Sequence, residues 1–148
     1  MKGELKMKIL IAYATKSGGS RMCAETLAAK IGNCEICDLG ERTPDINEYD
    51  LVILGSGIRM GGAYRPFKAF LKKNAGTLLK KRTAYFICNM QTEKLQKIAE
   101  KNIPGDLRNA AVCVRTFGGK APFGKGEDQS WMLTDEVDAF VREVKEIS

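Results

Sequence analysis

Hydroxyl-bearing, small and cationic residues are concentrated between positions 13 and 20. This segment lies between an apolar run at 9–12 and a helical pattern that begins at about Ser20. Backbone N–H groups are free at a helix N-terminus, and the helix dipole favours negative charge there. Glycine also lets the backbone approach an anion closely. The residues that could hold a phosphate group are Thr15, Lys16, Ser17, Gly18, Gly19 and Ser20.

The same segment also fits an ordinary turn between a strand and a helix. In that interpretation Ser20 is the N-cap, and its hydroxyl accepts a backbone hydrogen bond from the first helical turn. Such a turn requires no ligand. The residue pattern by itself favours the two interpretations about equally.

Two more polar turns follow apolar runs later in the chain. The turn after the run at 51–54 contains Ser56, Gly57, Ile58, Arg59 and Met60. The turn after the run at 84–88 begins with Asn89 and Met90. If all three runs are parallel strands, their carboxyl ends meet at one edge of the sheet, where such folds bind ligands. The three turns could then enclose a flat ring that carries a phosphate tail.

Strand and helix patterns alternate along the 148 residues, which we expect to form a single domain, 1–148. Strands are predicted at 9–12, 34–39, 51–54, 84–88 and 111–114, and helices at 20–31, 64–74, 93–101 and 134–147. The alternation predicts an α/β protein with a doubly wound, five-stranded parallel sheet in the order 2-1-3-4-5. Right-handed crossovers place the helices at 64–74 and 93–101 on the same face.

Cysteine and histidine usage limits the chemistry of this chain. It has five cysteines and no histidine. The absence of histidine excludes Ser-His-Asp and Cys-His nucleophiles and any histidine-ligated metal. Cys34 and Cys37 fall on a predicted strand with their side chains on opposite faces, so packing is expected rather than a redox or metal pair. The odd cysteine number and the absence of a signal-peptide pattern favour a cytoplasmic location.

Positive charge is concentrated in the middle of the chain. Segment 59–125 has fifteen Lys and Arg against three Asp and Glu, a net charge of +12, whereas the whole chain carries +6. This asymmetry favours an acidic partner, an anionic ligand or an anionic membrane surface, although any single lysine can simply be solvated. Nucleic-acid binding is not predicted, because aromatic residues are not interleaved with the charges.

Two stretches resemble a known family. The segment 14–20 looks like the phosphate loop of flavodoxin-like proteins, whose usual pattern is Ser/Thr-x-x-Gly-x-Ser/Thr. Segment 52–61, followed by 67–73, is similar to the branch that contains menaquinone-dependent protoporphyrinogen oxidase. The resemblance covers nearly the whole chain and implies a flavodoxin-like three-layer sandwich that binds FMN. It also implies that the first turn holds the phosphate and that the other two border the isoalloxazine ring.

The resemblance implies a role in electron transfer, as a small oxidoreductase or a redox carrier. A redox partner protein or a quinone-like acceptor is then expected, and no side chain stands out as a catalytic acid or base. Three features depart from the family: the basic charge, the single aromatic residue Tyr64 at the second turn, and the short segment 119–130. A binding module that has lost FMN and a nicotinamide-dependent quinone reductase are the alternatives.

Overall fold

The computed structural model of the chain describes residues 7–120 and 129–147. Its strands are β1 (Ile9–Ala14), β2 (Cys34–Asp38), β3 (Leu51–Arg59), β4 (Gly62–Ala63), β5 (Arg82–Cys88) and β6 (Val114–Thr116). Its helices are α1 (Gly19–Ile31), α2 (Arg65–Leu79), α3 (Leu95–Asn102), α4 (Gly105–Ala110) and α5 (Thr134–Lys145), with a 3-10 turn, Thr92–Lys94, before α3. Much of segment 119–130 lies outside the described residues.

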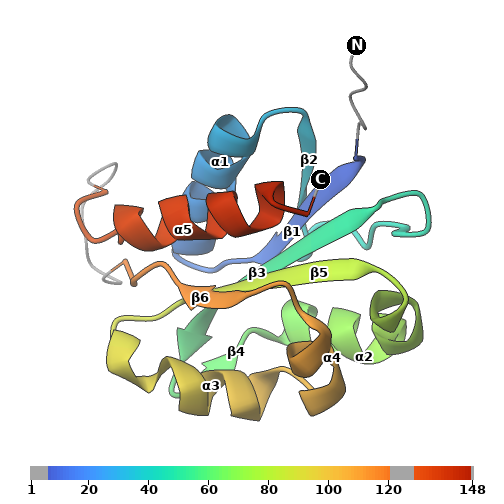
Figure 1. Ribbon diagram of the computed structural model, residues 1–148. Coiled ribbons are helices and arrows are strands. Elements are labelled where there is room, and N and C mark those ends of the chain that lie inside the picture. Colours follow the sequence, from blue (N-terminus) through green and yellow to red (C-terminus); the bar gives the residue numbers. More distant parts are fainter. Residues whose placement is uncertain (1–6, 121–128, 148) are drawn as a thin grey trace.

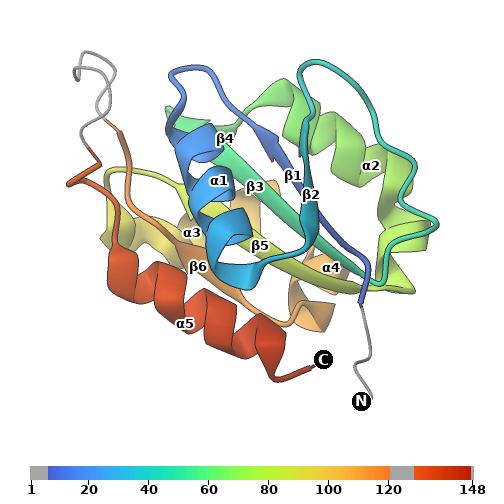
Figure 2. The same cartoon turned by 90° about the horizontal axis from the view of Figure 1, so that it is seen from above.

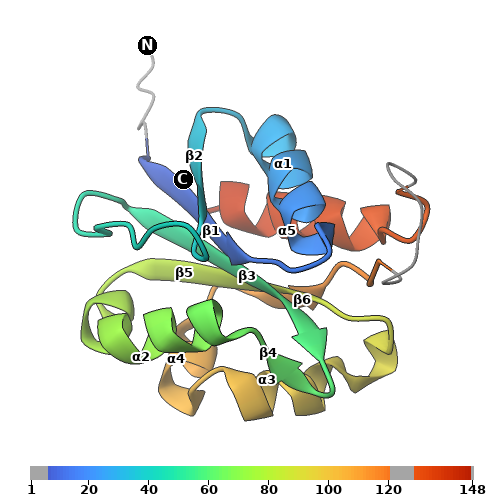
Figure 3. The ribbon, with the colours of Figure 1, turned by 180° about the vertical axis from the view of Figure 1, so that it is seen from behind.

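The main sheet is parallel and has the strand order β2-β1-β3-β5-β6. Since β4 only forms a short antiparallel hairpin with the end of β3, the predicted order 2-1-3-4-5 is confirmed. Figures 1 and 3 show α1 and α5 on one face and α2, α3 and α4 on the other. Figure 2 shows α1 and α5 lying next to each other over the sheet. The predicted three-layer α/β sandwich is therefore confirmed.

Side chains of the central strands alternate between two apolar layers. Leu10 and Val52 pack under α2, α3 and α4, whereas Ile11 and Ile53 pack under α1 and α5. All four are fully buried, as expected for parallel strands that helices cover on both faces. Cys37 and Cys34 join opposite layers, in agreement with the expectation that they do not form a pair.

Several element boundaries differ from the predicted ones. The second site turn is part of β3, because Gly55 and Gly57 continue the pairing with Phe86 and Cys88 of β5. The short helix α4 is absent from the predicted elements, and Pro104 occupies its N-cap position. Packing against neighbouring elements, which no local pattern records, decides both cases.

The last strand lies closer to the C-terminus than the predicted 111–114. Val112 already donates to the Thr83 carbonyl, but the regular strand covers Val114–Thr116. This shift brings Phe117 and the residues after it to the carboxyl edge of the sheet. Within the described residues, no helix is long and apolar enough to cross a membrane, and no group of three or more Cys, Asp or Glu could hold a metal ion.

Candidate cofactor site

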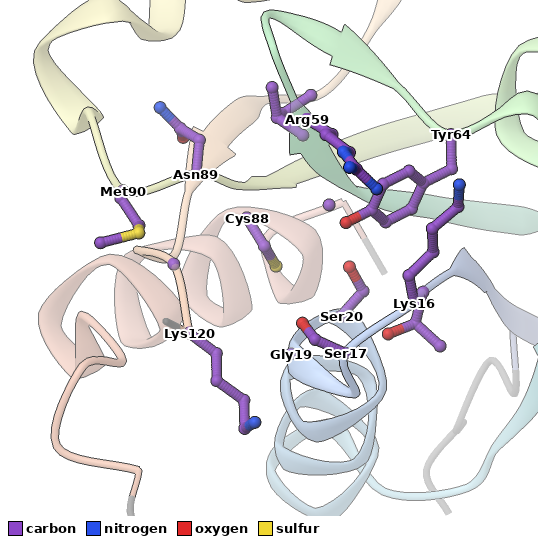
Figure 4. Close-up of a pocket in the computed structure, with 14 residues that line it drawn as sticks. Lys16, Ser17, Gly19, Ser20, Arg59, Tyr64, Cys88, Asn89, Met90 and Lys120 are labelled. Carbon is purple, nitrogen blue, oxygen red and sulfur yellow. The ribbon is translucent and has the colours of Figure 1, made fainter. Parts of the chain in front are cut away.

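A cavity of about 440 Å³ opens at the carboxyl edge of the parallel sheet (Figure 4). Loops after β1, β3, β5 and β6 contribute to it. Its lining consists of Thr15, Lys16, Ser17, Gly19, Ser20, Gly57, Ile58, Arg59, Tyr64, Cys88, Asn89, Met90, Gly119 and Lys120. None of these residues is acidic, and three of them are cations.

The loop between β1 and α1 forms one side of the cavity. Gly18 adopts a left-handed conformation (φ 92°) at the N-cap position, and its N–H donates to Thr15 Oγ1 over 2.9 Å. The α-helical hydrogen bonds begin with Met22 N donating to the Gly18 carbonyl. The N–H groups of the residues between them have no intrahelical acceptor, as at every helix N-terminus.

Ser20 lies in the first turn of α1 and is not the N-cap, because Gly18 holds that position. The alternative in which Ser20 caps the helix is therefore wrong. The residue is only 2% exposed, and its Oγ has no hydrogen-bond partner among the residues that the structure describes. Figure 4 shows this oxygen directed into the cavity. An unpaired buried hydroxyl beside helix N–H groups fits an anionic ligand such as a phosphate.

The second turn is held by Ser56, which is fully buried and does not line the cavity. Its Oγ accepts a hydrogen bond from Tyr64 N over 3.1 Å and donates one to the Gly57 carbonyl over 2.7 Å. The ring of Tyr64 packs against the backbone of Gly57, where a Cβ would lie 2.8 Å from Tyr64 Cε2. Ser56 therefore positions the turn and the aromatic side chain.

Among the described residues that line the cavity, Tyr64 is the one that is aromatic. Lys16 Nζ lies 5.2 Å from the centre of its ring, within the range of a cation–π contact. Burial raises the pKa of the Tyr64 hydroxyl, and the positive charge of Arg59 opposes this shift. Tyr64 is therefore neutral at pH 7 and offers an aromatic face and one hydroxyl.

The loops after β5 and β6 form the opposite wall. Asn89 is buried, accepts a hydrogen bond from Thr116 Oγ1 over 2.7 Å and donates to the Gln91 carbonyl. Gly119 approaches this wall so closely that a Cβ there would lie 2.6 Å from Met90 N. The side-chain amide of Asn89 is thus hydrogen-bonded within the protein. Its bond to Thr116 ties the loop after β5 to the end of β6.

The structure brings most of the predicted site residues to this cavity, with three exceptions. Gly18 shapes the first loop, Ser56 supports the second, and Met60 faces a neighbouring groove. Four of the lining residues are not among the predicted site residues: Tyr64, which was noted only as the aromatic residue at the second turn, Cys88, Gly119 and Lys120. Because the last strand was predicted at 111–114, Gly119 and Lys120 were too far beyond its expected end to be assigned to the site.

Cys88 lies at the base of the cavity next to Cys23 of α1. The two Sγ atoms are 3.5 Å apart, and both residues are buried. The hydrogen bond to Cys88 and burial raise the pKa of the Cys23 thiol far above its ordinary value. Cys23 is therefore a neutral thiol at pH 7 and a poor nucleophile.

Comparison with known proteins identifies the class to which this fold and site belong. A family model described as "Flavodoxin domain" matches residues 10–122. The chain therefore belongs to the flavodoxin domain family.

The individual relatives are oxidoreductases and flavoproteins. Over 96 residues the chain is 31% identical to protoporphyrinogen IX dehydrogenase [quinone] of Escherichia coli (strain K12). The matched region covers 62% of this chain and 53% of that protein. The chain thus spans about half the length of the curated relatives it matches. Oxidised flavodoxin 2 of Bacillus cereus has a TM-score of 0.70 at 20% identity, covering 95% of this chain and 99% of that one.

A flavoprotein from Lactobacillus acidophilus NCFM, solved in complex with FMN, is also similar. Its TM-score is 0.50 at 20% identity, and the match covers 77% of this chain and 92% of that one. At this level of identity, the two solved structures support the shared fold.

Proposed function

We propose that this protein binds FMN in the cavity at the carboxyl edge of the sheet and acts in electron transfer. The observation that carries this proposal is the buried, unpaired hydroxyl of Ser20 at the N-terminus of α1. Among the described residues that line this cavity, three are cations and none is acidic. The chemistry of this donor set fits a phosphate monoester, and the volume falls within the usual range of small-molecule sites.

The residues around the cavity divide into two groups in this proposal. Thr15, Lys16, Ser17, Gly18, Gly19 and Ser20 form the phosphate end, with Thr15 and Gly18 shaping the loop. Ser56, Gly57, Ile58, Arg59, Asn89 and Met90 border the ring, Ser56 and Asn89 by fixing the backbone. FMN would supply the electron-transfer chemistry. The protein binds and orients it, since none of the described residues that line the cavity carries a carboxylate that could move a proton.

The name of the Escherichia coli relative indicates a quinone, so we propose a quinone-like acceptor. A redox partner protein and peripheral contact with an anionic membrane are further proposals that rest on the basic segment. Lys68, Lys72 and Lys73 of α2 are exposed there. We also propose a cytoplasmic location, because free thiols are typical of proteins in a reducing compartment.

Adding FMN to the purified protein tests the proposal directly. We expect the absorption spectrum of FMN to shift and its fluorescence to change on binding, with one FMN per chain. Unchanged spectra at saturating protein would contradict FMN binding and favour a binding module that has lost the cofactor. Rapid reduction of the bound FMN by NADH or NADPH would instead favour the nicotinamide-dependent quinone reductase.

Replacing Arg59 by alanine should lower the reduction potential of the bound FMN. Arg59 lines the cavity but is exposed, so solvent screens its charge. A solvent-screened cation a few ångströms from a ring that gains negative charge on reduction is worth about 1 kcal/mol. The expected shift is therefore about 20–60 mV for one electron. The measurement is a redox titration of the FMN-loaded protein.

Two matched variants complete that titration. Arg59→Lys keeps the charge and should keep most of the potential, and Arg65→Ala removes a nearby exposed cation that does not line the cavity. If Arg65→Ala lowers the potential as much as Arg59→Ala, the effect reflects net charge rather than the position of Arg59.

A further inference from the structure

A second concave surface lies directly beside the cofactor cavity. It has a volume of about 670 Å³ and shares Ile58, Asn89 and Met90 with that cavity. We call it the α3 groove: its walls are residues 58–61 at the hairpin tip, residues 89–91 after β5, and the side of 94–101 that faces them. The volume lies within the range of small-molecule sites and is small for a protein partner.

Exposed methionines line this groove. Met60 is 93% exposed and Met90 is 65% exposed, and they are two of the four large hydrophobic side chains that the described residues expose. Ile58 and Ile98 continue the apolar lining beneath them. Flexible, polarisable methionine side chains are suited to contacts with flat apolar ligands.

Met60 also has an unfavourable backbone conformation. It has a φ of 52°, and with Gly61 (φ 80°) it forms the two-residue turn between β3 and β4. Turns in which both residues have positive φ strongly favour Asn-Gly. A bulky apolar residue that is both exposed and left-handed is disfavoured for folding, and such outliers concentrate at functional sites.

The two walls of the groove are fixed to each other by Asn102 at the end of α3. Its Nδ2 donates to the Gly61 carbonyl over 3.0 Å, and its Oδ1 accepts from Ala63 N over 2.9 Å. Asn102 is buried, with 5% exposure. The hairpin tip is therefore anchored to α3, and these hydrogen bonds hold the two walls of the groove in place.

Three lysines give the groove a positive charge. Lys94, Lys97 and Lys101 are exposed and line it, and their spacing puts them along one side of the helix. None of them takes part in an ion pair within residues 7–120 and 129–147, and no acidic residue lines the groove. Lys101 Nζ is close to the hairpin tip, 3.4 Å from where a Cβ on Gly61 would lie.

We propose that the α3 groove binds a flat, apolar ring compound that carries carboxylate or sulfonate groups. The rings would lie on the methionines and isoleucines, and the anionic groups would reach the three lysines. Such a ligand would contact Ile58 and Met90, which also border the cofactor cavity. Its assignment as an acidic, quinone-like electron acceptor rests on the proposed function, whereas its binding does not.

Calorimetric titration with anthraquinone-2,6-disulfonate tests the groove. The probe is added to protein saturated with FMN, and one binding site is expected. Replacing Lys94, Lys97 and Lys101 together by glutamine should weaken binding by about tenfold or more, since charged hydrogen bonds are lost. The matched control replaces Lys68, Lys72 and Lys73 by glutamine. It changes net charge equally outside the groove and should weaken binding less than about threefold.

Met60→Asn tests the apolar part of the groove independently of charge. Asparagine suits the turn, so the midpoint of thermal unfolding should rise while affinity for the probe falls about threefold or more. This combination separates a binding role from a folding role. An unchanged affinity would overturn the contact with Met60.

Other outcomes would also overturn the proposal. An equal loss in the two lysine variants would show that net charge alone attracts the probe. Loss of probe binding when FMN is added would place the probe in the cofactor cavity. If FMN itself does not bind, the same titration of the protein alone still applies. Lysine-dependent binding would then support the groove even though the proposed function had failed.

Discussion

FMN should bind this protein at least about 100-fold more tightly than riboflavin, which lacks the phosphate. The phosphate would meet the N-terminus of α1, the unpaired Ser20 hydroxyl and the Lys16 and Lys120 side chains. A hydrogen bond to a charged group contributes about 1.5–3 kcal/mol. Ser20→Ala should therefore weaken FMN binding about tenfold to 100-fold. Fluorescence titration with both ligands measures these affinities, and equal affinities would show that the turn is not a phosphate site.

The same substitution should have little effect on folding, and this separates a ligand role from a structural one. Because Ser20 Oγ is buried without a partner in the described structure, its removal relieves an unsatisfied polar group. We expect the free energy of unfolding without FMN to stay constant or to rise by about 1 kcal/mol. Thr26→Ala is the matched control, since the Thr26 hydroxyl donates to the Met22 carbonyl in the same helix and does not line the cavity. It should leave FMN affinity unchanged.

The strand order was predictable from the sequence because buried parallel strands are continuous apolar runs. Residues 9–12, 51–54 and 84–88 are such runs, and all three lie in the centre of the sheet. The β4 hairpin and α4 were not predictable in this way. Each is short, and each is stabilised by contacts with distant residues, such as the bond between Ala63 N and Asn102.

The roles of individual polar residues were less predictable than their location. Ser20 and Ser56 both follow glycine in glycine-rich turns, and the sequence offers no basis for separating them. In the structure, Ser56 uses its hydroxyl twice within its own turn, whereas Ser20 has an unused one. Only the three-dimensional arrangement distinguishes a hydroxyl that is hydrogen-bonded within its own turn from one that is available to a ligand.

Gly55→Ala should lower the free energy of unfolding by about 2–4 kcal/mol, because it overpacks the core. A Cβ at Gly55 would lie 2.0 Å from Phe86 Cζ. The Phe86 ring cannot move aside, since it is fully buried, stacked on Phe117 at 5.2 Å and edge-on to Phe140 at 6.4 Å. Denaturant unfolding measures the loss. Gly76→Ala in α2 is the control, since a Cβ there meets nothing within 4 Å and should be neutral or slightly stabilising.

A second substitution shows whether the contact with Phe86 is the cause. Phe86→Leu shortens the side chain and should cost less in the Gly55→Ala background than alone, which a double-mutant cycle measures. Additive effects would contradict the clash. Gly55 lies two residues before Gly57, and Phe117 lies two residues before Gly119; Gly57 and Gly119 both line the cavity. Because a displaced Phe86 ring would also disturb the Phe117 ring stacked on it, we expect Gly55→Ala to shift both segments and weaken FMN binding, although Gly55 itself does not line the cavity.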